Sequence, residues 1–120
     1  MSVSSEYLEY VIDQLQCIGD VQSKRMFGGI GLYSDELFFG LIDDDVLYFK
    51  VDDQTRSTYL SARAKPFDPY KDGNASTGYY SVPAKVLEDV DELKSWAKEA
   101  VDTARRKAAT KKSRKPRKKR

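Results

Sequence analysis

The chain has 120 residues, of which 33% are charged and 40% are hydrophobic, with a formal net charge of +2 and no histidine. This length fits one folded domain, and the lack of histidine removes the commonest general base at neutral pH and the commonest metal ligand. No apolar run approaches the ~20 residues that cross a bilayer, and the single Cys17 has no disulfide partner within the chain, so we expect a protein of a reducing, cytoplasmic compartment.

The first predicted element is an amphipathic helix near the N-terminus. Its apolar residues recur at steps of three and four, which places them on one buried stripe. The stripe consists of Tyr7, Leu8, Val11, Ile12, Leu15 and Ile18. Ser4 or Ser5 can cap the start of this helix, and Gly19 can close it. Cys17 lies within the apolar pattern, so we expect a buried structural thiol rather than a reactive one.

Residues 21–51 change to short apolar and aromatic runs separated by turn residues, which is typical of strands. We predict three or four antiparallel strands in a meander. The turns are expected at Gly28-Gly29, at Ser34-Asp35-Glu36 and at Asp43-Asp44-Asp45. Some strands are apolar on both faces, which predicts helices over at least one face and leaves a second subunit as a cover for the other.

The next predicted element is a short helix through residues 55–64, capped by Asp52 or Asp53 and stopped by Pro66. Two prolines and an Asp-Gly step make residues 66–74 irregular. Residues 79–82 are predicted as a final strand, with the region around Phe67 as a pairing partner.

The last predicted helix begins after Asp89, which with Glu92 three residues later resembles a capping arrangement. Its apolar stripe consists of Leu93, Trp96, Ala97, Ala100, Val101 and Ala104. Beyond Ala104 we expect this helix to fray, and we expect Pro116 to prevent it from reaching the end of the chain. The order α-β-β-β(-β)-α-β(-β)-α predicts a two-layer α+β domain, an antiparallel meander sheet flanked by helices, over residues 1–104.

Residues 105–120 are predicted to be a disordered basic tail, because they hold eleven of the 21 basic residues and none of the 19 acidic ones. The body therefore has ten basic residues against 19 acidic ones, a charge of −9 beside a tail of +11. Such a tail gains affinity for nucleic acid through release of condensed counterions, without reading sequence; the alternative is a merely solubilising extension. The candidate nucleic-acid-binding residues are Arg105, Arg106, Lys107, Lys111, Lys112, Arg114, Lys115, Arg117, Lys118, Lys119 and Arg120.

The remaining candidates for chemistry favour structural interpretations. The segment Gly28-Gly29-Ile30-Gly31 lacks the spacing and the Lys-Ser/Thr of a phosphate-binding loop, so a tight turn or bulge is preferred. The aspartates at 43–45 are interpreted as a hairpin turn rather than a cation site, and Lys24-Arg25 as edge-strand or ion-pair residues rather than an anion site. Trp96 and Tyr79-Tyr80 could stack bases, but core packing is favoured. We predict no enzyme, metal or cofactor.

Several motifs together resemble the N-terminal domain of the TfoX/Sxy competence-regulator family. They are Arg25-Met26-Phe27-Gly28-Gly29-Ile30-Gly31-Leu32-Tyr33, Tyr48-Phe49-Lys50-Val51-Asp52, Pro66-Phe67-Asp68-Pro69-Tyr70, Tyr79-Tyr80-Ser81-Val82-Pro83 and Leu87-Glu88-Asp89. The resemblance covers about residues 7–104 and identifies Arg25, Met26, Phe27, Gly28 and Gly29 as family signature positions.

This resemblance implies a bacterial cytoplasmic protein without catalytic activity, an antiparallel sheet flanked by helices, and a role in regulating transcription of competence genes together with the cyclic-AMP receptor protein. The chain differs from those regulators because a basic tail stands where their C-terminal domain would be. By packing arguments we expect Met26 and Phe27 to fill the sheet core. We therefore expect a non-enzymatic accessory protein that contacts nucleic acid through its tail and engages a protein partner such as a transcription factor; the alternative is a partner-binding or homodimeric module with a solubilising tail.

Overall fold

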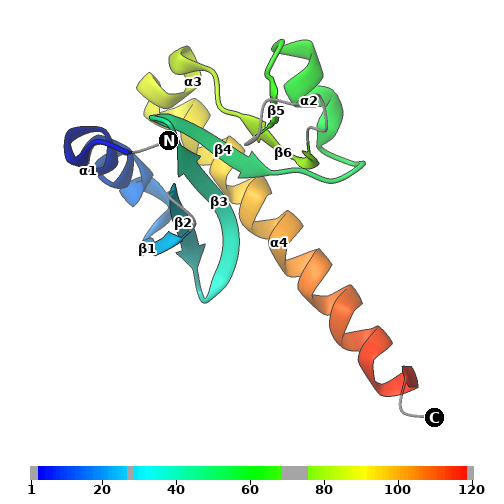
Figure 1. Cartoon of the computed structure of the whole chain (residues 1–120). Helices are drawn as coiled ribbons and strands as arrows, with labels where there is room; N and C mark the ends of the chain where they lie inside the picture. The colour runs from blue at the N-terminus through cyan, green and yellow to red at the C-terminus, as the bar shows by residue number, and fades with distance from the viewer. Residues whose placement is uncertain (1–2, 27–28, 69–75, 119–120) are drawn as a thin grey trace.

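A computed structural model describes residues 3–26, 29–68 and 76–118 (Figure 1). In chain order the elements are α1 (Ser5–Leu15), the 3-10 turn η1 (Gln16–Ile18), β1 (Gln22–Met26), β2 (Gly29–Ser34), β3 (Leu37–Asp43), β4 (Val46–Lys50), α2 (Arg56–Ser61), β5 (Pro66–Phe67), β6 (Ser76–Ser81), α3 (Ala84–Glu88) and α4 (Val90–Lys118). This α+β order confirms the predicted fold class.

The strands form one antiparallel sheet of order β1-β2-β3-β4-β6-β5, so the predicted meander consists of four strands. Its hairpin turns form where polar residues accept positive φ angles: Asp35 and Glu36 have φ 53° and 63°, and Asp44 and Asp45 have φ 54° and 58°. The turn interpretation of the aspartate triplet is therefore confirmed. Pairing of Phe67 with β6 is confirmed as well.

The helices α1 and α4 pack on one face of the sheet, where they bury the apolar stripes predicted from the sequence. Val11 and Leu15 of α1 and Leu93 and Ala97 of α4 are fully buried. The register of β3 shifts beside Leu32/Tyr33 of β2. Close strand packing here depends on Gly40, because a Cβ at this position would lie 2.7 Å from the Tyr48 carbonyl oxygen.

Side-chain caps define where the elements begin. The Ser4 hydroxyl, not that of Ser5, accepts the Tyr7 N–H at 3.2 Å, while the Ser4 N–H donates to Asp45 at 2.8 Å and so links α1 to the β3–β4 turn. The Asp89 carboxylate accepts the N–H groups of residues 91 and 92, which confirms the predicted cap of α4.

Three predictions about helices require correction. The helix α2 ends at Ser61, earlier than expected, and Arg63 with φ 60° follows it. The helix α3 was not predicted, because its five residues are too few to show a helical period. The helix α4 does not fray after Ala104 but continues to Lys118 and includes Pro116. Lys, Arg and Ala are strong helix formers, so a helix already held by the core continues through them.

Cys17 is half-buried rather than fully buried, and desolvation raises the pKa of its thiol, which disfavours the reactive thiolate. Within the residues described above, no helix combines the length and apolar character needed to cross a membrane.

Candidate nucleic-acid interface

The predicted basic tail is the C-terminal part of α4. Figure 1 shows this part, coloured orange to red, leading away from the sheet. The sequence predicts disorder for residues 105–120, whereas the backbone of residues 105–118 is helical here; the division of the chain at Ala104 into a domain and a tail stays a prediction. The cationic residues thus follow directly on a buried segment of the same helix, since Ala100 and Ala104 are in the core.

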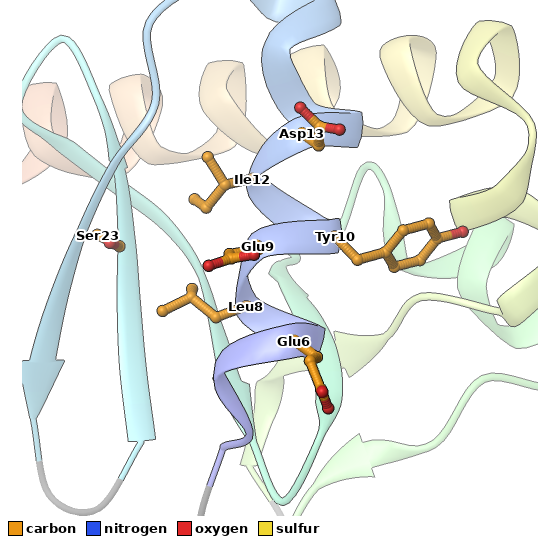
Figure 2. A pocket seen from close by; sticks show the side chains of 7 residues that line it. All are labelled: Glu6, Leu8, Glu9, Tyr10, Ile12, Asp13 and Ser23. Carbon is orange, nitrogen blue, oxygen red and sulfur yellow. The ribbon is translucent and has the colours of Figure 1, made fainter.

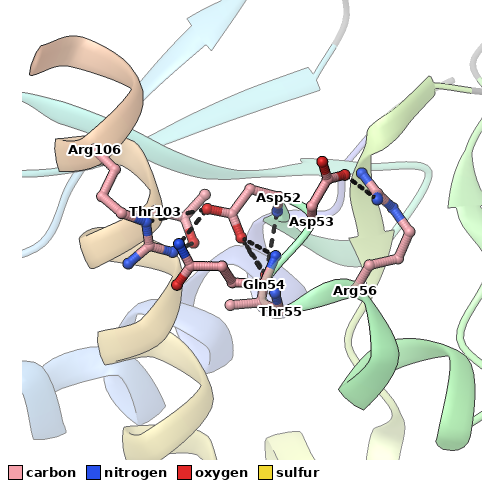
Figure 3. A network of polar contacts seen from close by, with 7 residues as sticks. All are labelled: Asp52, Asp53, Gln54, Thr55, Arg56, Thr103 and Arg106. Carbon is pink, nitrogen blue, oxygen red and sulfur yellow. Dashed lines mark hydrogen bonds and ion pairs between the residues drawn. The ribbon is translucent and has the colours of Figure 1, made fainter. Parts of the chain in front are cut away.

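A polar network fixes the point where α4 leaves the body (Figure 3). The Arg106 guanidinium donates to one oxygen of Asp52, with Nε at 3.1 Å and Nη2 at 2.8 Å from Oδ2. Nη2 also donates to the hydroxyl of Thr103, which is fully buried, at 3.1 Å. Arg106 therefore joins α4 to the loop between β4 and α2, and we call Arg106, Asp52 and Thr103 the anchor.

The second oxygen of Asp52 is used by its own loop. Oδ1 accepts the N–H groups of Gln54 and Thr55, each at 3.1 Å, and the Thr55 hydroxyl at 3.3 Å. Asp52, and not Asp53, therefore caps the turn that leads into α2; Asp53 pairs with Arg56. Desolvation acts to raise the pKa of Asp52, but hydrogen bonds from Arg106 and the Thr55 N–H outweigh it and hold this pKa below its usual range.

Not all of the predicted nucleic-acid-binding residues have the same surroundings. Arg106 is used in the anchor, and Arg105 pairs with Asp102 at 3.0 Å in an exposed contact. A phosphate would have to compete with Asp52 for Arg106, so the candidate interface begins at the exposed Lys107. Its further predicted members on the helical backbone are Lys111, Lys112, Arg114, Lys115, Arg117 and Lys118. Lys119 and Arg120 lie outside the described residues.

The family signature positions lie at the turn between β1 and β2. Arg25 is exposed on β1, and Met26 ends that strand. Gly29 opens β2, and a Cβ there would lie 2.6 Å from the Ile42 carbonyl oxygen, so the two backbones approach closely at this position. Phe27 and Gly28 lie outside the described residues, as does the side chain of Met26, so their expected place in the core stays a prediction.

A shallow groove of about 680 Å³ lies between α1 and β1 (Figure 2). Leu8 and Ile12 point toward the strand that carries Ser23, and the carboxylates of Glu9 and Asp13 line the same groove. This acidic lining repels phosphate, so the groove is no part of a nucleic-acid interface. Among the described residues no group of His, Cys, Asp and Glu could hold a metal ion.

The aromatic residues considered as base-stacking candidates separate into two environments. Tyr80 is buried in the core, and Trp96 packs edge-on against Tyr59 with 4.6 Å between ring centroids, so core packing is confirmed for these two. Tyr79 instead lies on the opposite face of the sheet, 5.9 Å from the ring of Phe38. Sequence reasoning expected some strands to be apolar on both faces but favoured core packing for Tyr79, although alternation of core and non-core residues along the strands was a signal that Tyr79 lies opposite the buried Tyr80.

A comparison with curated protein sequences gives no match to the chain. The TfoX N-terminal domain family matches residues 13–104, which is most of the chain and includes the signature positions and the buried half of α4. The sheet with its flanking helices and this match over the body lead to one assignment: the chain belongs to the TfoX N-terminal domain family.

Proposed function

We propose that this protein is a non-enzymatic, cytoplasmic accessory protein that binds nucleic acid through the cationic part of α4. The observation that carries the proposal is the continuation of a core helix into a segment with nine Lys and Arg residues from Lys107 to Arg120, beyond the two that pair with carboxylates. Cationic side chains that contact phosphates do not read base edges, so the proposed binding is non-specific.

Membership in the TfoX N-terminal domain family supports a regulatory role for the body. In this proposal the body engages a protein partner such as a transcription factor, and the cationic helix holds the complex on nucleic acid near the regulated gene. Regulation of competence genes is the finer form of the same proposal.

The test is a salt titration of binding to labelled duplex DNA. If six to eight phosphates are neutralised, the slope of log K against log salt is about −5 to −7. A tail variant in which four cations become glutamine keeps the helix propensity of the segment. We expect it to reduce the magnitude of the slope by about 3 to 4. This variant is Lys111→Gln, Lys112→Gln, Arg114→Gln and Lys115→Gln.

The matched control removes the same charge from exposed positions of the body. It is Lys65→Gln, Lys85→Gln, Lys94→Gln and Lys98→Gln. We expect the control to keep most of the slope and affinity. Equal losses in the two variants, or no binding by the native chain at low salt, would show that the cationic helix is not the interface.

A further inference from the structure

A second surface, on the body itself, has features of a nucleic-acid site. Along β2, β4 and β6 the side chains alternate between the two faces of the sheet. Leu32, Phe49 and Tyr80 are buried in the core that α1 and α4 cover. Their neighbours along the strands therefore point to the opposite face, which carries a different set of side chains.

That opposite face is aromatic. Five half-buried rings form a continuous row across β2, β3, β4, β5 and β6, with neighbouring centroids 4.9 to 6.4 Å apart. In spatial order the row consists of Tyr33, Phe38, Tyr79, Phe67 and Tyr48, and we call it the aromatic row. All contacts between its members are tilted or edge-on, so no two of these rings are stacked face to face.

Two lysines lie over the same end of the row. The Lys24 ammonium is 5.7 Å from the Tyr33 centroid, and the Lys50 ammonium is 5.3 Å from the Phe38 centroid and 5.8 Å from that of Tyr79. At the other end the charge is reversed, since Asp43, Asp44 and Asp68 act on Tyr48 and, after desolvation, raise the pKa of its hydroxyl. Phosphates are thus favoured only beside Tyr33, Phe38 and Tyr79.

We propose that this end of the aromatic row binds single-stranded nucleic acid, with bases stacked on Tyr33, Phe38 and Tyr79 and phosphates held by Lys24 and Lys50. Aromatic side chains on an open sheet can stack two or three bases, and cations beside them follow the backbone. A duplex cannot use this surface, because its bases are already stacked against each other.

A second copy of the chain is the alternative occupant of the same face. A two-fold axis can set the lysine end of one row against the aspartate end of the other, so charge does not disfavour such a pair. The two lysines beside Tyr33, Phe38 and Tyr79 match the charge of phosphate, and on this ground we commit to a single strand. A homodimer is an outcome of the test.

The experiment compares two probes, a labelled oligothymidylate and a mixed-sequence duplex of the same length, with the full chain. Phe38→Leu removes a stacking ring and keeps an apolar side chain, and Tyr10→Leu is the control, since Tyr10 is 40% exposed on α1 and away from the row. We expect Phe38→Leu to weaken single-strand binding about tenfold and to change duplex binding less than about twofold, while Tyr10→Leu changes neither.

The following outcomes of this experiment would overturn the proposed single-strand site. The proposal is overturned if Phe38→Leu weakens binding of both probes equally or weakens binding of neither. It is also overturned if sedimentation shows that the native chain is a dimer and that the Phe38→Leu variant is a monomer. If the variant fails to fold, ultraviolet crosslinking of oligothymidylate to the native chain is the test instead. Crosslinks at sites other than Tyr33, Phe38 and Tyr79 then overturn the proposal. The tail variant weakens binding of both probes, so this inference and the proposed function can fail separately.

Discussion

Removing the charge of Asp52 tests whether the anchor holds α4 to the body. The change Asp52→Asn keeps an oxygen that can cap the turn before α2 but removes the charged acceptor of two hydrogen bonds from Arg106. The two side chains are 17% and 41% exposed. Exposed ion pairs contribute about 0.2–1 kcal/mol and hydrogen bonds to charged groups about 1.5–3 kcal/mol, so we expect a coupling of about 1 kcal/mol.

The assay is a double-mutant cycle with Asp52→Asn and Arg106→Gln, in which urea unfolding is followed by fluorescence of the single tryptophan, Trp96. Trp96 reports on the core because its ring contacts Tyr59. The control cycle uses the Asp102–Arg105 pair, whose side chains are 59% and 56% exposed, and we expect a coupling below about 0.5 kcal/mol there.

The pH dependence of the coupling between Asp52 and Arg106 tests the direction of the pKa shift of Asp52. Because the pKa of Asp52 is lower in the folded protein than its ordinary value of 3.8, the stabilisation is fully present above that value and is lost as the pH falls through the lower folded pKa. A coupling near zero at neutral pH, or one that persists when Asp52 is protonated, would refute the role of Arg106 as an anchor.

Two further predictions concern stability. Gly40→Ala should cost more than Gly19→Ala in thermal unfolding, because a Cβ at Gly40 meets the Tyr48 carbonyl at 2.7 Å and the Phe49 ring at 3.1 Å. At Gly19, with φ 104°, a Cβ has open space, so alanine costs only the strain of this backbone conformation, about 1–3 kcal/mol; equal costs would contradict this. Burial raises the pKa of Tyr79 to about 12, so folding stability should fall as the pH rises above about 10, and Tyr79→Phe should reduce that fall in urea midpoints measured at alkaline pH.

The elements that the sequence predicts well are those whose signals are local. The stripe through Val11 and Leu15 has a helical period, the polar turns of the meander separate short apolar runs, and Ser4 and Asp89 have the side chains that cap helices. In each case, neighbouring residues alone determine the local structure. The five-residue α3 gives no such period, and its Val86 is buried only because α1 and α4 pack beside it.

The candidate site was less predictable, because its key contact joins distant residues. Asp52 and Arg106 are 54 positions apart, and nothing in their local sequence indicates that a capping aspartate also holds the last helix. Composition located the cationic residues but gave no sign of the helical backbone over residues 105–118, since it describes how segment 105–120 behaves alone and not as the continuation of a packed helix.

The first half of α4 packs in the core and its second half carries the cationic residues, so the body influences the cationic segment through one continuous helix. An isolated helix of this length is marginal in water because nucleation is costly, and lysine and arginine at neighbouring positions repel each other. In the chain the nucleus is supplied by Leu93, Ala97 and Ala100, which are buried against the sheet, and the anchor at Arg106 holds the turn where burial ends. The cationic segment needs only to extend this helix, and phosphates that neutralise its charges remove the repulsion that opposes it. If the segment binds a polyanion as proposed, that contact and helical order in the tail favour each other, and the folded body determines the direction in which α4 leads away from the sheet (Figure 1).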